Sequence, residues 1–263
     1  MAKTAPDYDA YQTSFHDAFR DELYGIIDAL PAAGDALDVP CGNGFYSRRL
    51  AERTSGRLTA VDSNDEYLRS ARAAVTGRAV RKADAYQLPF ADATFDLVWC
   101  AQSLISLDPD RAVREMFRVV KPDGVVAVLE VDEFHRVLLP WPPELEAAIP
   151  RAVYKASVLK YGDAIKLAPS RKLRAVLNRA GFGSVRRTTH PFDRAAPFDL
   201  PTVTFVERHV EYLRSLVYAR LPAPMRKAFD RVTDAGAAGS LYRLPGAELI
   251  CINAVYLASP WAK

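Results

Sequence analysis

The sequence has few cysteines and no pattern that would make them a framework. Its 263 residues include three, Cys41, Cys100 and Cys251, which lie far apart and form no CxxC pair. A disulfide scaffold and a zinc site are therefore disfavoured, and we expect no metal. A reduced, cytoplasmic protein is the expectation.

Long apolar runs are also missing. No run approaches the roughly 18–20 residues that a membrane span needs. The opening residues, MAKTAPDYDA, have no apolar core of a secretion signal. We expect no membrane partner, and a chain of this length is enough for one large α/β domain or two small ones.

Charge is small in total but unevenly distributed. Residues 1–150 contain 16 Lys and Arg against 24 Asp and Glu (net −8), and residues 151–263 contain 19 against 8 (net +11). A basic second half could attract an anionic small molecule, an acidic carrier protein or nucleic acid. A solvated basic surface is the alternative, because the arginines are scattered.

The apolar pattern changes period along the chain. Apolar residues recur at helical spacing from Tyr8 to Leu30, which predicts one helix that Pro31 and Gly34 end. Short apolar runs then alternate with helical patterns, which predicts βαβ units and a parallel sheet. Strands are expected at 36–39, 57–62, 79–84, 95–100, 125–131, 184–192 and 247–258, with a turn at 121–124 and helices at 45–53, 65–75, 110–120 and 169–182.

The stretch "LDVPCGNGFY" (37–46) joins the first strand to a helix. It can be a nucleotide-binding turn, a reactive-cysteine site or a tight connection. Gly42 and Gly44 would let a ligand approach the backbone. A dinucleotide fingerprint needs a third glycine at position 47, which is Ser47, so a nucleoside ligand without phosphates fits better.

Two acidic residues follow the next strands. Asp62 ends the second strand and could accept hydrogen bonds from both hydroxyls of a ribose, or it could be the N-cap of the helix near Asp65. Asp84 ends the third strand and could accept a hydrogen bond from an adenine amine, or it could cap a turn.

Together these segments resemble the class I S-adenosylmethionine-dependent methyltransferases, in their small-molecule branch. "LDVPCGNG", "AVDSN", "ADAYQLPFADATFDLVWC" and "REMFRVVKPDG" are similar to four family motifs, in order and at the right spacing, from about 35 to 131. The resemblance implies a Rossmann-like, doubly wound seven-stranded sheet, mostly parallel with an antiparallel last strand. It also implies an N-terminal helix and a helical lid insertion. Pro40 and Asp123 depart from the family's glycines.

The resemblance implies one domain, 1–263: a helical cap (1–34), a cofactor-binding core (35–135) and substrate or lid segments (136–180 and 199–240). The cofactor would be S-adenosylmethionine, with S-adenosylhomocysteine as product. Asp62 would bind the ribose and Asp84, with the Ala85 amide, the adenine. Asp38, Ala101 and Gln102 would lie along the methionine part, and Tyr11 would close over the cofactor. The whole implied set is Tyr11, Asp38, Pro40, Cys41, Gly42, Asn43, Gly44, Asp62, Ser63, Asp84, Ala85, Ala101 and Gln102.

A general base is harder to assign. His135 follows the fifth strand and is the candidate to remove a substrate proton, with a surface role as the alternative. Many family members have a histidine after the fourth strand, but "AQSLISLD" has none. The expected activity is methyl transfer to O, N or C of a small molecule. Alternatives are a non-methylating, pericyclase-like member and an RNA or protein methyltransferase. Nucleic acid is disfavoured, and monomer and homodimer both stay open.

Overall fold

The chain divides into two compact units, each built from segments that are far apart in the sequence. The computed structural model describes residues 8–54, 57–131, 137–161 and 169–261. The assignment of the whole chain to one domain stays a prediction. The sheet unit comprises Asp21–Asp132, Ala168–His190 and Asn253–Lys263, and the helical unit comprises Met1–Arg20, Glu133–Leu167 and Pro191–Ile252.

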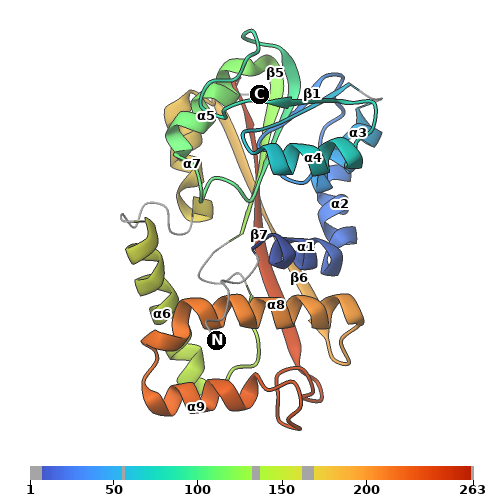
Figure 1. Ribbon diagram of the computed structural model, residues 1–263. Coiled ribbons are helices and arrows are strands. Elements are labelled where there is room, and N and C mark those ends of the chain that lie inside the picture. Colours follow the sequence, from blue (N-terminus) through green and yellow to red (C-terminus); the bar gives the residue numbers. More distant parts are fainter. Residues whose placement is uncertain (1–7, 55–56, 132–136, 162–168, 262–263) are drawn as a thin grey trace. The chain divides into compact units, whose positions relative to one another are not determined.

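A seven-stranded sheet in the order β3-β2-β1-β4-β5-β7-β6 organises the chain (Figure 1). β1 to β5 run parallel, and β7 is antiparallel to β5. β1 lies between β2 and β4, so the strand order reverses at β1, where doubly wound folds bind ligands. The predicted fold class is confirmed. The strands are β1 (Ala36–Asp38), β2 (Leu58–Asp62), β3 (Ala79–Lys82), β4 (Phe95–Ala101), β5 (Val120–Val131), β6 (Ser184–Ala195) and β7 (Glu248–Ser259).

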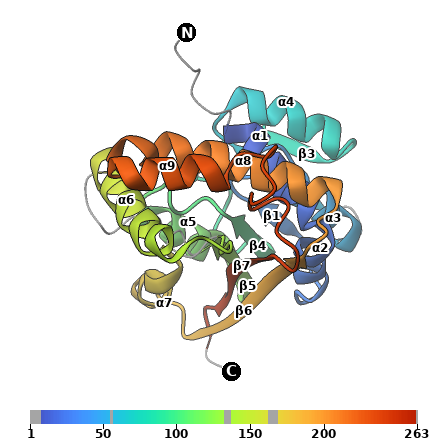
Figure 2. The same ribbon diagram turned by 90° about the horizontal axis from the view of Figure 1, so that it is seen from below.

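Helices pack in pairs within each unit. In the sheet unit, α5 contacts α7 and α3 contacts α4 (Figure 1). In the helical unit, α1 contacts α8, and α6 contacts both α8 and α9 (Figure 2). None of the helices in the described part of the chain is long and apolar enough to cross a membrane. The helices are α1 (Tyr8–Ala18), α2 (Arg20–Asp28), α3 (Phe45–Arg53), α4 (Asp65–Ala74), α5 (Pro109–Val119), α6 (Pro143–Tyr161), α7 (Pro169–Ala180), α8 (Leu200–Val217), the 3-10 helix η2 (Tyr218–Arg220) and α9 (Ala223–Val232).

Local sequence explains where α5 begins and which face it buries. Asp108 is its N-cap and accepts a hydrogen bond from the Arg111 amide, and Pro109 follows at the first helical position. The apolar side chains recur at three- and four-residue steps and are fully buried in the main core of the sheet unit. They are Ala112, Val113, Met116 and Val119.

Two details of the predicted elements are wrong. The helix predicted from Tyr8 to Leu30 is two helices, because the helix breaks at Phe19. Phe19 is itself fully buried, so the apolar period continues across the break and hides it. The turn predicted at 121–124 belongs to β5, where the pairing with β4 shifts register. A Cβ at Gly124 would lie 2.9 Å from the Asp96 carbonyl oxygen, so glycine permits the close approach of the two strands.

Candidate functional site

Most of the predicted cofactor-binding residues lie at the carboxyl ends of neighbouring strands in the sheet unit. Asp38 ends β1, Asp62 ends β2 and Ala101 ends β4. Asp84 follows the end of β3 by two residues. Because these strands are parallel and adjacent, their carboxyl ends form one edge. The structure brings these residues to the edge at which the sequence placed them.

Backbone hydrogen bonds hold the turn after β1 against β2. The Cys41 amide donates to the Val61 carbonyl oxygen at 2.8 Å. The Gly42 amide donates to Oδ2 of Asp62 at 3.0 Å. The turn then closes on itself, because the Gly44 amide donates to the Cys41 carbonyl at 3.0 Å. The shape of the glycine turn is therefore fixed by the carboxylate that ends the next strand.

Gly42 and Gly44 serve different purposes although only one residue separates them. Both have positive φ angles, 53° and 85°. A Cβ at Gly44 would lie 2.9 Å from Cα of Ala71 in α4, so this glycine permits helix packing. A Cβ at Gly42 would have no atom of the described residues within 4 Å. The space over Gly42 is open, as a ligand that approaches the backbone requires.

Asp62 is a buried carboxylate with two backbone donors. Oδ2 accepts from the Gly42 amide, and Oδ1 accepts from the Asn64 amide at 2.9 Å. The alternative of a helix N-cap at Asp62 is wrong, because the N-cap of α4 is Asn64, whose side chain accepts from the Glu66 amide. Each carboxylate oxygen has a second lone pair, so Asp62 retains acceptor capacity for hydroxyl groups.

Asp38 is the most deeply buried acidic side chain of the site, with 1% of its surface exposed. Ser47 donates a hydrogen bond of 2.5 Å to its Oδ2. Burial raises the pKa of Asp38 from 3.8 to about 7; the Ser47 hydrogen bond opposes this shift and the charge of Asp62 adds to it. A cationic ligand group near Asp38 would stabilise its charged form. No local sequence pattern predicts this contact between Ser47 and Asp38.

The thiol of Cys41 packs in a small apolar cluster with Ala60, Leu68 and Ala71. Burial raises the pKa of the Cys41 thiol, and the charges of Asp38 and Asp62 raise it further. A nucleophilic cysteine requires a lowered pKa. The buried, apolar surroundings of Cys41 therefore disfavour the reactive-cysteine interpretation of this turn.

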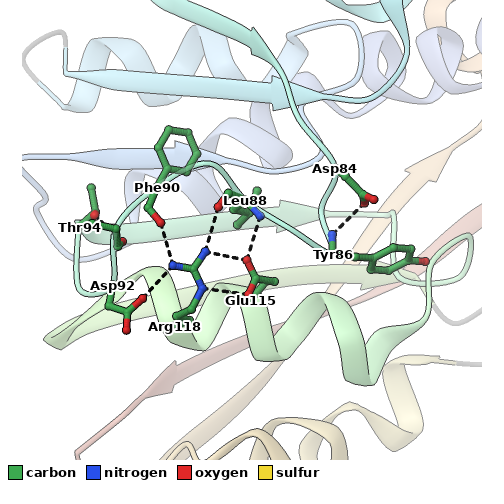
Figure 3. Close-up of polar contacts among 9 residues, drawn as sticks. Asp84, Tyr86, Leu88, Phe90, Asp92, Thr94, Glu115 and Arg118 are labelled. Atoms are coloured by element: carbon green, nitrogen blue, oxygen red, sulfur yellow. Dashed lines mark hydrogen bonds and ion pairs between the residues drawn. The ribbon is translucent and has the colours of Figure 1, made fainter.

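Asp84 opens the loop between β3 and β4. Its Oδ1 accepts a hydrogen bond from the Tyr86 amide at 2.9 Å (Figure 3). Its carbonyl accepts from the Gln87 amide at 3.0 Å. The Asp84 side chain is exposed, whereas Ala85 is buried. Asp84 therefore does cap a turn, as the alternative interpretation predicted. This contact leaves the exposed carboxylate able to accept a further hydrogen bond.

Gln102 follows β4 in an unusual backbone conformation, with φ at 52°. Its amide donates to the Leu129 carbonyl at 2.8 Å. Its side-chain Nε2 is buried and has no hydrogen-bond partner among the described residues. A buried donor without a partner is costly, so a bound acceptor would stabilise this arrangement.

Glu130 is a buried acidic residue that the sequence analysis missed. It lies in β5 with 2% of its surface exposed, and its Oε1 accepts from the amides of Ser103 at 3.2 Å and Leu104 at 2.8 Å. It therefore fixes the loop that follows Gln102. An acidic residue within the apolar run "VVAVLEV" is the signal that would have identified it.

The remaining predicted residues have varied surroundings. Pro40 is half-buried, and Ser63 is exposed. The side chain of Asn43 accepts from the Phe45 amide at 3.1 Å, so it fixes the start of α3. His135, the candidate base, lies outside the described residues. The roles assigned to all these residues stay predictions.

Tyr11 belongs to an aromatic cluster within the helical unit. Its ring stacks on Phe205 at 5.9 Å and on Tyr212 at 5.0 Å between centroids. Its hydroxyl and Nδ1 of His209 share a hydrogen bond of 3.0 Å. The ring of Tyr11 is almost fully buried. Its predicted contact with the cofactor stays a prediction.

Known proteins with similar sequences are methyltransferases. Residues 37–128 match the family model described as a methyltransferase domain. The chain is 40% identical over 142 residues to the ubiquinone/menaquinone biosynthesis C-methyltransferase UbiE of Bordetella avium, covering 51% of this chain and 54% of that protein. It is 35% identical over 135 residues to the 27-O-demethylrifamycin SV methyltransferase of Amycolatopsis mediterranei, covering 48% and 47%. The chain thus spans about half the length of these curated relatives.

Solved structures share the fold over nearly the whole chain. A SAM-dependent methyltransferase of Thermotoga maritima, titled a possible histamine N-methyltransferase, superposes with a TM-score of 0.55 at 17% identity, covering 97% of this chain and 94% of that one. The [4+2]-cyclase SpnF superposes with a TM-score of 0.51 at 20% identity, covering 92% and 81%. At these identities the likeness establishes the fold alone.

Sequence family and fold agree on the class of protein. Residues 37–128 of the chain match a methyltransferase domain, which agrees with the resemblance to the class I S-adenosylmethionine-dependent methyltransferases predicted from its motifs. The Thermotoga maritima structure is titled SAM-dependent, which is the cofactor that the sequence of this chain predicts.

Proposed function

We propose that the protein transfers a methyl group from S-adenosylmethionine to a small organic molecule. The observation that carries the proposal is the open space over Gly42, with the Gly42 amide fixed by the carboxylate of Asp62. This arrangement lies within the region that matches the methyltransferase family. A turn that is rigid and unobstructed suits close approach of a nucleoside to the backbone.

The residues of the sheet unit suit the three parts of the cofactor. Asp62 would accept hydrogen bonds from the ribose hydroxyls. Asp84 and the Ala85 amide would hold the adenine. The carboxylate of Asp38 accepts hydrogen bonds, whereas Nε2 of Gln102 donates them and has no partner among the described residues. These opposite characters suit the ammonium and carboxylate groups of a methionine moiety.

The chain's contribution to catalysis is placement. When bound, S-adenosylmethionine supplies an electrophilic methyl group on its sulfonium, which an acceptor atom attacks in line. Holding acceptor and methyl carbon in line can supply much of the rate acceleration. Accordingly, hydrogen bonds of 2.8–3.0 Å from backbone amides hold several groups at this edge in place. His135 remains the candidate for removing an acceptor's proton.

The class of acceptor is inferred from relatives and charge. The names of the relatives specify an O-methylation of a rifamycin and a C-methylation in quinone biosynthesis. Both acceptors are small organic molecules, which supports a small-molecule acceptor here and leaves the acceptor atom open. The net +11 of residues 151–263 favours an anionic acceptor.

A screen for product tests the proposal. The protein would be incubated with methyl-labelled S-adenosylmethionine and a panel of quinols, phenols and hydroxylated macrocycles. We expect an acceptor to gain one labelled methyl group by mass spectrometry, and Asp62→Asn to form much less product. Asp65→Asn is the matched control, because Asp65 is exposed and pairs with Lys82. Binding of the cofactor without transfer to any acceptor, in the panel or in cell extract, would contradict methyl transfer.

A non-methylating reaction on the same cofactor site is the second candidate. The absence of a histidine in "AQSLISLD" favours it, since base-assisted O-methylation is then less supported. The same screen separates the two: an acceptor would be converted with no gain in mass, and S-adenosylmethionine would not be consumed.

A further inference from the structure

One arginine in α5 anchors the loop between β3 and β4. Nη2 of Arg118 donates to the Leu88 carbonyl at 2.9 Å, and Nη1 donates to the Phe90 carbonyl at 2.7 Å (Figure 3). Nη1 also donates to Asp92 at 2.8 Å, while Nε and Nη2 donate to Glu115 at 2.9 and 2.7 Å. These five bonds match the five N–H donors of a guanidinium.

Glu115 completes this anchor. Its Oε2 accepts from the Leu88 amide at 2.9 Å, so Leu88 is held through both its N–H and its carbonyl group. The hydrogen bonds from Arg118 lower the pKa of Glu115. Lysine could not replace Arg118 equivalently, because an ammonium lacks the planar fork that reaches two carbonyls and a carboxylate together.

A second contact holds the start of the same loop. The hydroxyl oxygen of Tyr86 accepts from the Asp108 amide at 2.7 Å, and the guanidinium of Arg111 lies 4.2 Å from the centre of the Tyr86 ring. The Tyr86 amide in turn donates to Asp84. The loop is thus fastened to the first and the last turn of α5, with Asp84 and Ala85 next to the first anchor.

We infer that Arg118 is a positioning residue for adenine recognition, an inference that rests on the proposed function. Arg118 would act without touching the ligand, because its five N–H donors are all used within the protein. It fixes residues 88–90, and through them the turn in which the Asp84 carboxylate and the Ala85 amide lie together. A loop fixed before binding loses less conformational freedom when the ligand arrives and holds acceptor and donor at one spacing.

Hypoxanthine exchanges the donor and the acceptor at the two positions of the base that Asp84 and the Ala85 amide would bind. In S-inosylhomocysteine a carbonyl replaces the exocyclic amine, and the neighbouring ring nitrogen becomes a donor instead of an acceptor. A well-positioned Asp84 and Ala85 amide should therefore prefer S-adenosylhomocysteine. The ratio of the two dissociation constants reports loop shape, whereas a purely structural role of Arg118 would change both constants equally.

The experiment measures both ligands by calorimetry on the full chain. We expect Arg118→Gln to lower the preference for the adenosyl ligand by about tenfold, equivalent to the loss of roughly one well-formed hydrogen bond to a charged group. Arg114→Gln is the matched control, because Arg114 lies exposed on the same helix. We expect it to keep the wild-type preference. Arg118→Lys and Glu115→Gln carry the test if Arg118→Gln does not fold.

The outcomes separate the two proposals. If the wild-type protein binds S-adenosylhomocysteine and the folded Arg118 and Glu115 variants keep its preference, the inference is overturned and the proposed function stands. If the wild-type protein binds neither ligand, the proposed function itself fails. A reduced preference in these variants with Arg114→Gln unchanged supports the inference.

Discussion

The two units bury polar groups in different ways. In the sheet unit, buried carboxylates accept hydrogen bonds from neighbouring turns, loops or helices, as Asp38, Asp62 and Glu130 do. In the helical unit, the aromatic cluster encloses a Tyr11–His209 hydrogen bond. Charged groups therefore shape backbone in the sheet unit, whereas stacked rings fill space in the helical unit. Substitutions in the sheet unit should accordingly change turn shape and ligand binding as well as stability, whereas those in the helical unit should change stability.

The largest expected effect is loss of a ring from the aromatic cluster. Phe205 is fully buried and contacts the rings of Tyr11, Phe15 and Phe19. Phe205→Ala should lower the free energy of unfolding by about 3–5 kcal/mol, measured by urea denaturation. Tyr154→Ala is the control, since Tyr154 is 45% exposed. Equal small losses for both variants would contradict a packed aromatic core.

The next effect is a pH dependence that Asp38 confers on the sheet unit. Its pKa is about 7 when folded against an ordinary value of 3.8, so folding favours the protonated form. This term therefore lowers stability as the pH rises from about 4 to 7, by roughly 1.4 kcal/mol per pKa unit of difference. Asp38→Asn removes the titration. Its stability relative to wild type should rise across that pH range, and parallel unfolding curves at all pH values would contradict this.

Substitutions at the two glycines of the turn should have different effects on stability and on ligand binding. Gly44→Ala places a Cβ against the α4 backbone at a φ of 85°, so it should cost about 2–3 kcal/mol of stability. Gly42→Ala meets open space at a φ of 53° and should cost only about 1 kcal/mol, while it weakens S-adenosylhomocysteine binding. Thermal unfolding and calorimetry measure the two effects, and equal losses of stability would remove the distinction.

The smallest expected effect is removal of one hydroxyl group in the helical unit. Tyr11→Phe keeps the stacked ring and removes the hydrogen bond to His209. The free energy of unfolding should fall by about 1 kcal/mol, much less than in Phe205→Ala. A loss as large as that of Phe205→Ala would show that the hydrogen bond, and not the packing, stabilises the cluster.

The sequence predicted the sheet, and the edge at which Asp38 and Asp62 lie, for a physical reason. Parallel strands alternate with helices and bring their carboxyl ends to one edge. Asp38 and Asp62, which end strands, and Asp84, which follows β3 by two residues, could therefore be placed together from the apolar pattern alone. The turn after β1 could be predicted from its glycines, because its positive φ angles favour glycine.

The rest depends on contacts between distant residues, which no local pattern contains. Ser47 reaches Asp38, Glu130 reaches Leu104, and Arg118 reaches Leu88 across 30 positions. In the second half of the chain, aromatic side chains at helical spacing fill a core such as that around Phe205. Aromatic side chains that line a substrate pocket could have the same spacing, so the sequence does not distinguish the two. The acceptor therefore cannot be predicted from these positions.

The most direct test of the central claim is a calorimetric titration of S-adenosylhomocysteine into the wild-type protein, Asp62→Asn and Asp65→Asn. The account predicts saturable one-site binding to the wild type and to Asp65→Asn. It predicts binding weakened by about tenfold or more in Asp62→Asn, because the amide side chain lacks the carboxylate's charge and has only one acceptor oxygen. No binding to the folded wild-type protein, or equal affinities in all three, would contradict it.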